Sequence, residues 1–135
     1  MAQGMTYMDK PWLKSYEKGV PESIKFEEVS MSDFLERSVK DFPDDIALIF
    51  LGYKVTFRQL KDQVDRFATC LTDFGVKQGD SVSILLPNSI PCVVAYYSIL
   101  KIGAIVVMNN PLYSDPELQH QFNDSGSKVL ITLDA

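Results

Sequence analysis

The sequence has few of the residues from which metal, disulfide and nucleic-acid sites are built. Its 135 residues include two cysteines and one histidine. Cys70 and Cys92 are not spaced as metal ligands, so we expect reduced, buried thiols and no metal site. Lys and Arg total 13 against 18 Asp and Glu, which gives a net charge of −5, and no basic cluster occurs. The charge balance argues against nucleic-acid binding, because phosphate neutralisation needs a basic surface.

Long hydrophobic runs and glycine-rich phosphate loops are absent as well. The most apolar stretch, Pro91–Met108, is interrupted by Lys101 and Gly103, and it is shorter than the roughly 20 apolar residues of a membrane-spanning helix. The first ten residues lack the apolar centre of a secretory signal. Neither GxGxxG nor GxxxxGK[ST] occurs among the seven glycines. We therefore expect a soluble, cytoplasmic protein without a nucleotide-binding motif of its own.

No catalytic constellation is evident either. His120 lies in the middle of a predicted helix between two glutamines, and we expect it on the solvated surface. Asp115 and Glu117 fall in the first turn of that helix, where negative charge suits the helix dipole, and Ser114 with Glu117 forms a capping box. The pair Asp44–Asp45 is interpreted as a turn. The sequence predicts no catalytic, cofactor-binding or metal-ligating residue.

What the sequence does contain is a regular alternation of strands and helices in its last third. The predicted strands cover 81–86, 104–107 and 128–132, and the predicted helices cover 89–101 and 115–124. Such an alternation indicates parallel strands with right-handed crossovers, so the fold class is α/β with a partial β-α-β-α-β sheet. The chain stops three residues after the third predicted strand. We therefore expect it to be the front piece of a larger protein.

The first part of the sequence predicts an arm, a helix and a hairpin. Residues 1–29 show no sustained period and are interpreted as an extended N-terminal arm, which Trp12 and Tyr16 can anchor to a surface. Cap chemistry at Ser30 predicts the start of a helix. The hairpin strands cover 46–50 and 53–55, and residues 51–52 form the turn.

Two of the predicted helices differ in their apolar pattern. Thr56 caps the first, with Gln59 completing the capping box, and Gly75 ends it. Its apolar stripe consists of Leu60, Val64, Phe67, Leu71 and Phe74. The helix over 89–101 is instead apolar nearly all round and must be covered on several sides. Because the other elements are too few to cover it completely, we expect missing partner structure.

Two loops lie where ligands bind in open α/β folds. Leu86–Ser89 joins a strand to a helix N-terminus, a position that favours anions. Asn109–Tyr113 follows the second strand at the same edge of the sheet. Neither loop has the glycine that would let a phosphate approach. We expect them to border a site whose reactive groups lie elsewhere.

Read in order, these segments resemble the N-terminal portion of the adenylate-forming enzymes, the superfamily of acyl-CoA synthetases, luciferases and peptide-synthetase adenylation domains. Val55–Leu60 is similar to the first core motif, with Phe57 in place of the usual Tyr and Gln59 in place of the usual Glu. Gly79–Ser89 resembles the next block, and Leu100–Tyr113 resembles the second core motif. Residues 110–130 and the start, 11–21, resemble the bacterial long-chain fatty-acid–CoA ligase branch in particular.

The resemblance implies that residues 30–135 are the incomplete N-terminal part of a large AMP-binding domain. It implies a ligase that joins a fatty acid to ATP, giving an acyl-adenylate and pyrophosphate, and then transfers the acyl group to coenzyme A. ATP, Mg²⁺ and coenzyme A are implied for the full-length enzyme, whereas this piece is expected to bind none of them and to be inactive. The resemblance also implies homodimer contacts through the arm, and it allows the full-length enzyme to associate peripherally with a membrane.

Other readings of the sequence stay open. One is a ligase for medium-chain, aromatic or other acids. A second is a self-contained, flavodoxin-like α/β binding module, which would fold alone and bind a nucleotide. A third is an interaction protein that docks through a helix face containing Tyr96, Tyr97 and Ile99, since an exposed apolar patch marks a partner surface.

Overall fold

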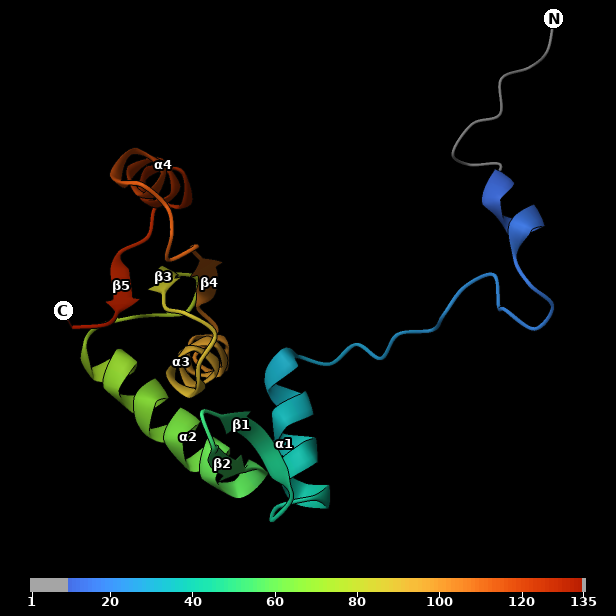
Figure 1. Ribbon diagram of the computed structural model, residues 1–135, viewed down its shortest axis with the longest axis horizontal. Helices are drawn as coiled ribbons and strands as arrows, with labels where there is room; N and C mark the ends of the chain where they lie inside the picture. Colours follow the sequence, from blue (N-terminus) through green and yellow to red (C-terminus); the bar gives the residue numbers. More distant parts are fainter. Residues whose placement is uncertain (1–9, 135) are drawn as a thin grey trace, which may run out of the picture.

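Two small sheets, four α-helices and one 3₁₀ helix make up the part of the chain that the computed structural model describes, residues 10–134 (Figure 1). In chain order the elements are η2 (Pro11–Ser15), α1 (Met31–Asp41), β1 (Ile46–Phe50), β2 (Tyr53–Thr56), α2 (Phe57–Asp73), β3 (Ser81–Leu85), α3 (Ile90–Lys101), β4 (Ile105–Met108), α4 (Asp115–Ser125) and β5 (Val129–Thr132). The predicted elements of the body are all present, with ends that differ by a residue or two.

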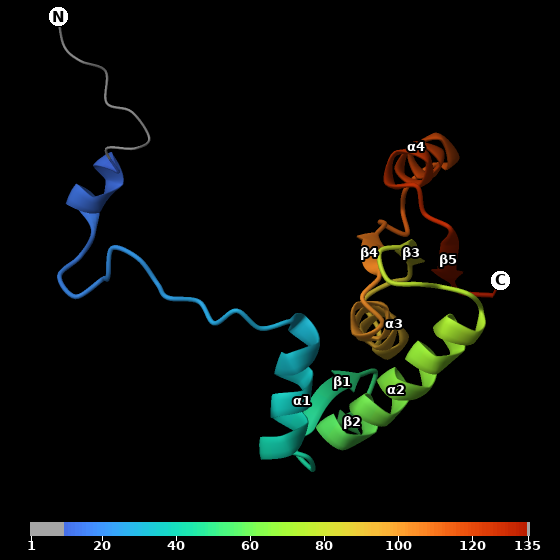
Figure 2. The same cartoon turned by 180° about the vertical axis from the view of Figure 1, so that it is seen from behind.

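The α/β prediction is confirmed by the larger sheet. Its strand order is β4-β3-β5, and β3 pairs in parallel with both neighbours. Ser83 of β3 lies opposite Val107 of β4 and Leu130 of β5. The chain crosses from β3 to β4 through α3 and reaches β5 through α4. Helices α2 and α3 lie on one side of this sheet and α4 lies on the other (Figures 1 and 2).

The N-terminal arm contains one short helix. Residues 1–9 lie outside the described residues, and the 3₁₀ helix η2 replaces the irregular structure expected over Pro11–Ser15. The arm runs away from the body in both views (Figures 1 and 2), and the side chain of Tyr16, expected to anchor it, is 42% exposed. The domain boundary between residues 29 and 30 stays a prediction.

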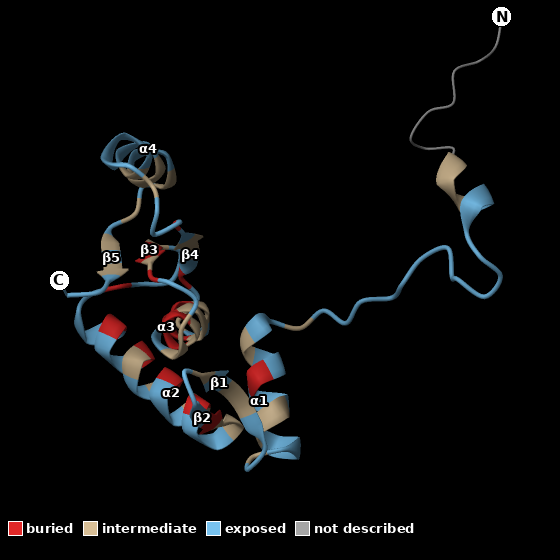
Figure 3. Ribbon diagram, viewed as in Figure 1, coloured by how far each residue is buried: buried red, intermediate tan, exposed pale blue. Residues whose placement is uncertain are grey.

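Helix α3 takes part in two hydrophobic clusters. In Figure 3 the ribbon of α3 is mostly red and tan, that is, buried or half-buried. Its Ala95 and Ile99 pack with Val82 and Ile84 of β3, whereas its Val94 packs with residues of α1, β2 and α2. The second cluster consists of Leu35, Val55, Leu60, Val64 and Val94. Every residue of α3 is buried or half-buried except Pro91 and Lys101, its second and last residues.

The chain covers α3 on several sides but not completely, since Ile90, Val93, Tyr96, Tyr97 and Leu100 stay half-buried. Helices α1 and α2, the hairpin strand β1 and strands β3 and β4 all contact it. Of the docking face expected on this helix, Ile99 is fully buried and so cannot contribute, whereas Tyr96 and Tyr97 are half-buried. The predicted apolar stripe of α2 supplies part of this cover.

The polar residue inside α3 is bonded across to α2. Ser98 is fully buried, and its Oγ lies 2.7 Å from the carbonyl oxygen of Val94 and 3.0 Å from that of Val64. Buried hydroxyls need such partners, since an unpaired one costs about 1–3 kcal/mol. The bond therefore sets how closely α2 and α3 approach.

The predicted stripe of α2 is confirmed except at its end. Leu60, Val64 and Leu71 are buried, but Phe74 is 75% exposed. The helix ends at Asp73, and Gly75 adopts a φ of 99°. The amide of Val76 then donates to the carbonyl of Leu71, as in a Schellman motif. This turn buries the side chain of Val76 in the place expected for Phe74.

The cap predictions are confirmed at three helix starts. Ser30 and Asp33 form a capping box on α1, as Thr56 and Gln59 do on α2. At α4, Glu117 accepts hydrogen bonds from the amide of Ser114 at 2.8 Å and from its hydroxyl at 2.6 Å. Within residues 10–134, no helix combines the length and apolar character that crossing a bilayer requires.

Four alternating charges join three helices at the surface. Lys61 of α2 lies 2.6 Å from Asp65 of the same helix and 3.1 Å from Glu36 of α1. Lys101 of α3 pairs with both Glu36 and Asp65. Partial burial alone would raise the pKa of Glu36, but hydrogen bonds from Lys61 and Lys101 outweigh it and hold that pKa below its usual value. The pKa of Asp65 is lowered by the same balance.

These lowered pKa values predict a loss of stability in acid. A group whose pKa is lower in the folded state stabilises the fold above its unfolded pKa of about 4.3 and loses that contribution as pH falls through the folded value. We expect Glu36→Gln to flatten the dependence of the unfolding free energy on pH below about 5, measured by urea denaturation. The effect should be about 1 kcal/mol or less, since the pair is partly exposed. Glu22→Gln removes the same charge outside the cluster, and equal flattening by both variants would contradict the prediction.

The central position of α3 predicts a large cost for a cavity there. Ile99→Ala should lower the free energy of unfolding by about 2–5 kcal/mol, because the side chain is fully buried between the sheet and α2. Ile24→Ala, at a position 67% exposed in the arm, is the matched control and should change it by less than about 0.5 kcal/mol. Similar losses in the two variants would show that α3 does not hold the core together.

Candidate functional site

The two loops singled out in the sequence come together at the carboxyl edge of the parallel sheet. Leu86–Ser89 joins β3 to α3, and Asn109–Tyr113 joins β4 to α4. They enclose a hollow of about 480 Å³, here called the edge hollow. It is lined by Leu86, Pro87, Asn88, Met108, Asn109, Asn110, Pro111 and Leu112. This is the position at which open α/β sheets bind ligands.

Both loops are held by their own hydrogen bonds. The hydroxyl of Ser89 donates to the carbonyl of Pro87 at 2.9 Å and accepts from the amide of Cys92, which caps α3. In the second loop, Oδ1 of Asn110 accepts from the amide of Leu112 at 3.0 Å. Side-chain bonds of this kind specify a turn without glycine. The rims of the edge hollow are therefore set by local sequence.

Asn109 ties the two strands together where they end. Its backbone amide donates to the carbonyl of Ile84 at 2.9 Å. Its side-chain Nδ2 donates to the carbonyl of Val107 at 3.1 Å and lies 3.4 Å from that of Ile84. Reversing the carboxamide would set Oδ1 against those two carbonyls, so this orientation is the favourable one.

The Oδ1 atom of Asn109 is an unusual feature of this site. The residue is 4% exposed, and within residues 10–134 Oδ1 is the buried side-chain nitrogen or oxygen without a hydrogen-bond partner. The sequence had indicated the loop but not this residue. The available signal was an amide placed directly after an apolar strand. An unpaired buried acceptor costs about 1–3 kcal/mol.

The chemistry of the lining does not fit a phosphate or a magnesium ion. Carboxamides, prolines and apolar side chains line the edge hollow, with no charged group among them. Phosphate recognition in proteins uses cations or glycine-rich backbone, and Mg²⁺ uses carboxylates. Within residues 10–134 there is also no group of three or more His, Cys, Asp and Glu that could hold a metal ion. The edge hollow suits a neutral, mostly apolar occupant.

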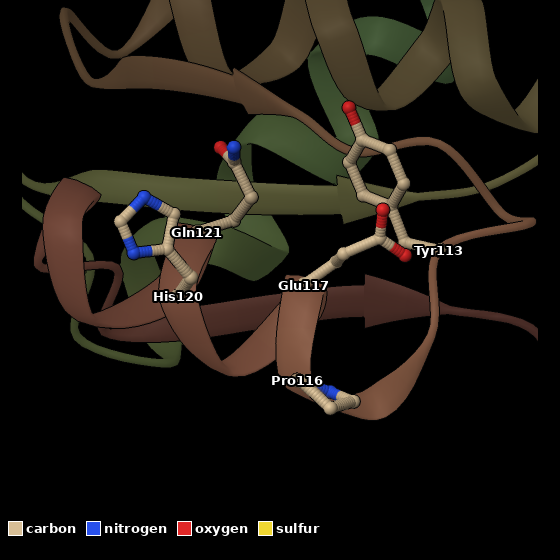
Figure 4. A pocket seen from close by; sticks show the side chains of 5 residues that line it. All are labelled: Tyr113, Pro116, Glu117, His120 and Gln121. Atoms are coloured by element: carbon tan, nitrogen blue, oxygen red, sulfur yellow. The ribbon is translucent and has the colours of Figure 1, made fainter.

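A second hollow, of about 330 Å³, lies along α4 and contains the histidine (Figure 4). His120 is exposed, as the sequence predicts, and the carboxylate of Glu117 lies beside Tyr113 rather than beside the imidazole (Figure 4). Hydrogen bonds from the side chain and backbone of Ser114 hold the pKa of Glu117 below its usual value. The carboxylate is thus engaged in capping the helix, and it forms no acid–base pair with His120.

The two cysteines lie in different environments. Cys92 is buried, and burial raises the pKa of its thiol. Cys70 is exposed, which corrects the expectation that both thiols are buried. It lies on α2 beside the apolar stripe rather than within it, so its side chain faces solvent. Neither cysteine contributes to the edge hollow.

Comparison with known proteins identifies the family. A family model described as AMP-binding enzyme matches residues 35–135. The chain belongs to this family. It is 38% identical over 125 residues to a Long-chain-fatty-acid–CoA ligase of Bacillus subtilis (strain 168), a match that covers 93% of this chain and 22% of that protein. A Long-chain-fatty-acid–CoA ligase of Escherichia coli O157:H7 is 40% identical over 126 residues, covering 92% of this chain and 22% of the relative.

Solved structures of AMP-binding relatives share the fold. The N-terminal subdomain of NpsA from Klebsiella oxytoca matches with a TM-score of 0.75 and 28% identity, over 78% of this chain and 28% of that one. The anthranilate CoA ligase AuaEII, in complex with anthranoyl-AMP, matches with a TM-score of 0.72 and 30% identity, over 76% of this chain and 20% of that one. The chain thus matches an N-terminal subdomain of adenylate-forming enzymes and spans about a fifth of the length of its curated relatives.

Because the lining of the edge hollow is uncharged, we predict that the 135-residue chain does not bind ATP. Titration with ATP and Mg²⁺ in a calorimeter should give no saturable heat up to about 1 mM, because no cation meets the phosphates in the edge hollow. Adenosine is the control ligand for binding through the base alone. Saturable heat with ATP that is absent with adenosine would contradict this prediction and favour a self-contained nucleotide-binding module.

Proposed function

We propose that this chain is the N-terminal part of an ATP-dependent, AMP-forming acid–CoA ligase whose acid is a long-chain fatty acid. The observation that carries the proposal is the identity of 35–40%, over more than nine-tenths of the chain, to several proteins named Long-chain-fatty-acid–CoA ligase. Membership of the AMP-binding family supports the adenylate-forming part of the proposal. The chain length of the acid is the finer part of the proposal.

In this proposal residues 10–134 act as a scaffold. Acyl-adenylate formation needs cations and Mg²⁺ around the phosphoryl group, where charge develops in the transition state. The edge hollow has neither a cation nor a carboxylate in its lining. ATP, Mg²⁺, coenzyme A and the fatty acid would therefore bind to parts of the enzyme outside these residues.

The arm supports a further part of the proposal, a homodimer. Ile24 and Phe26 are 67% and 83% exposed, and Val20 is 51% exposed. Exposed apolar side chains on an extended segment favour contact with another surface. In the proposed enzyme that surface belongs to a second copy. A cytoplasmic location, with peripheral membrane association of the complete enzyme, also belongs to the proposal.

An aromatic acid is the second candidate substrate. The anthranilate CoA ligase AuaEII shares 30% identity and the fold with this chain, and NpsA structures carry 3-hydroxyanthranilyl, anthranilyl and 3-hydroxybenzoyl analogues. These similarities are lower than those to the long-chain ligases. They support the same chemistry with a different acid.

An activity assay on the polypeptide that the gene encodes tests the proposal. With ATP, Mg²⁺ and coenzyme A, we expect palmitate to be used at least about tenfold better, by kcat/KM, than octanoate, because each methylene in a fitted apolar pocket adds discrimination. The 135-residue chain alone should release no pyrophosphate. A preference for anthranilate would favour the aromatic-acid alternative, and no acyl-CoA from any of the three acids would contradict the proposal.

A further inference from the structure

We propose that residues 20–26 of the N-terminal arm close as a strap over an apolar groove beside α1 of the same copy, with Ile24 and Phe26 seated in the groove. The groove is a hollow of about 370 Å³, here called the α1 groove. It is lined by Phe34, Leu35 and Ser38 of α1 and by Val93 and Tyr97 of α3, and residues of β1 and α2 complete it. The proposed homodimer uses the same arm side chains, so strap closure and dimer formation exclude each other.

The lining of the α1 groove is uncharged and partly open to solvent. Phe34 is 47% exposed, and Val93 and Tyr97 are half-buried, so apolar surface of both helices stays accessible. The hydroxyl of Ser38 donates to the carbonyl of Phe34 at 2.9 Å, which satisfies it within α1. Accessible apolar surface in a hollow favours an apolar occupant. The α1 groove therefore suits large apolar side chains.

The arm supplies side chains of this kind. Ile24 is 67% exposed and Phe26 is 83% exposed. In an extended segment, residues two apart point to the same side. Ile24 and Phe26 can thus enter the α1 groove together, while Lys25 between them points to water.

One end of the arm is already held at the rim of the α1 groove. Glu27 forms an ion pair with Arg37 of α1. The guanidinium of Arg37 lies 6.0 Å from the centre of the Phe34 ring, and Phe34 lines the groove. This pair holds the residue next to Phe26 beside the groove wall. Because both charged side chains are half exposed or more, the pair contributes little to stability, and its role is to orient the arm.

The length of the arm allows the closure. Phe26 lies four residues before Ser30, the N-cap of α1, and four extended residues span about 13 Å. Ser38 lies about 12 Å along the helix from Ser30, at roughly 1.5 Å per residue. Phe26 therefore reaches the α1 residues of the groove without any change in α1. The arm as described runs away from the body, which is the open position of the strap (Figures 1 and 2).

Disulfide trapping in the 135-residue chain tests the closure. In a Cys70→Ser background, Ser23→Cys lies in the arm and Ser38→Cys lies in the groove. A disulfide needs Cα atoms within about 7 Å, so oxidised glutathione links this pair only when the arm closes. At low protein concentration we expect linked monomers on a non-reducing gel.

The matched control for the trapping combines Ser15→Cys with Ser38→Cys, which places the arm thiol outside residues 20–26. The Ser23 pair should link at least about tenfold faster, because docking raises the effective concentration of one thiol near the other. Equal rates for the two pairs would overturn the proposal. Linked dimers at every concentration, without linked monomers, would also overturn it.

A variant of the arm tests the larger anchor. Phe26→Ser leaves the body unchanged, and it should slow the linkage of the Ser23 pair at least about tenfold, because burial of a phenylalanine side chain favours the closed position by that factor or more. Tyr16→Ser also removes an exposed aromatic side chain of the arm, but outside residues 20–26, and should leave the rate unchanged. Equal slowing by both variants would contradict the seating of Phe26.

Hydrogen–deuterium exchange provides a second measurement without added cysteines. Phe26→Ser should speed amide exchange at 34–38 relative to the unmodified chain, whereas exchange at 118–122 in α4 should not change. Unchanged exchange at 34–38 would overturn the proposal. This comparison decides the closure if Ser38→Cys disturbs α1.

The outcomes separate the strap from the proposed function. Linked monomers that give way to linked dimers as the protein concentration rises would support both the strap and the homodimer. Linked monomers at every concentration would support the strap and contradict the homodimer. Neither result depends on acid–CoA ligase activity, so failure of the strap leaves the proposed reaction unaffected.

Discussion

The structure depends on the need to cover α3 on nearly every side. This helix has apolar side chains around most of its circumference, and its one buried polar side chain, Ser98, is bonded to backbone carbonyls. Burial of apolar surface is the main stabilising term in folding, so the other elements are arranged around this helix. Helices α1 and α2 and the hairpin cover one side, and the parallel sheet covers the other. One helix thus joins two clusters that would otherwise be separate cores.

The same constraint positions the edge hollow. Helix α3 follows β3 after the short loop Leu86–Ser89, and its Ile99 packs with Val82 and Ile84 of that strand. Packing the helix on the strand that precedes it fixes Leu86–Ser89 at the carboxyl edge of the sheet. The loop after β4 reaches the same edge because β4 is parallel to β3. Asn109 then bonds both strands. The edge hollow therefore arises from core packing, and its two loops contain no charged residue.

The helix caps and the parallel pairing of the sheet were predictable from sequence, whereas individual contacts between residues far apart in the chain were not. The caps at Ser30 and Thr56 depend on residues three apart, and the parallel sheet follows from the order of its elements. Phe74 was misplaced because the Schellman turn after α2 exchanges it for Val76. How far the other elements cover α3 depends on contacts between residues far apart in the chain. The partnerless Oδ1 of Asn109 depends on carbonyls of two strands, one of them 25 residues away, which no local pattern reveals.

Among the described residues, charge is concentrated away from the edge hollow. The densest charges, on Glu36, Lys61, Asp65 and Lys101, neutralise one another where three helices meet. A lysine held between two carboxylates is not free to bind a phosphate. At the edge hollow, by contrast, charge is absent and an amide lacks its partner. The described residues thus separate a charged surface cluster, which joins three helices, from an uncharged hollow at the edge of the sheet.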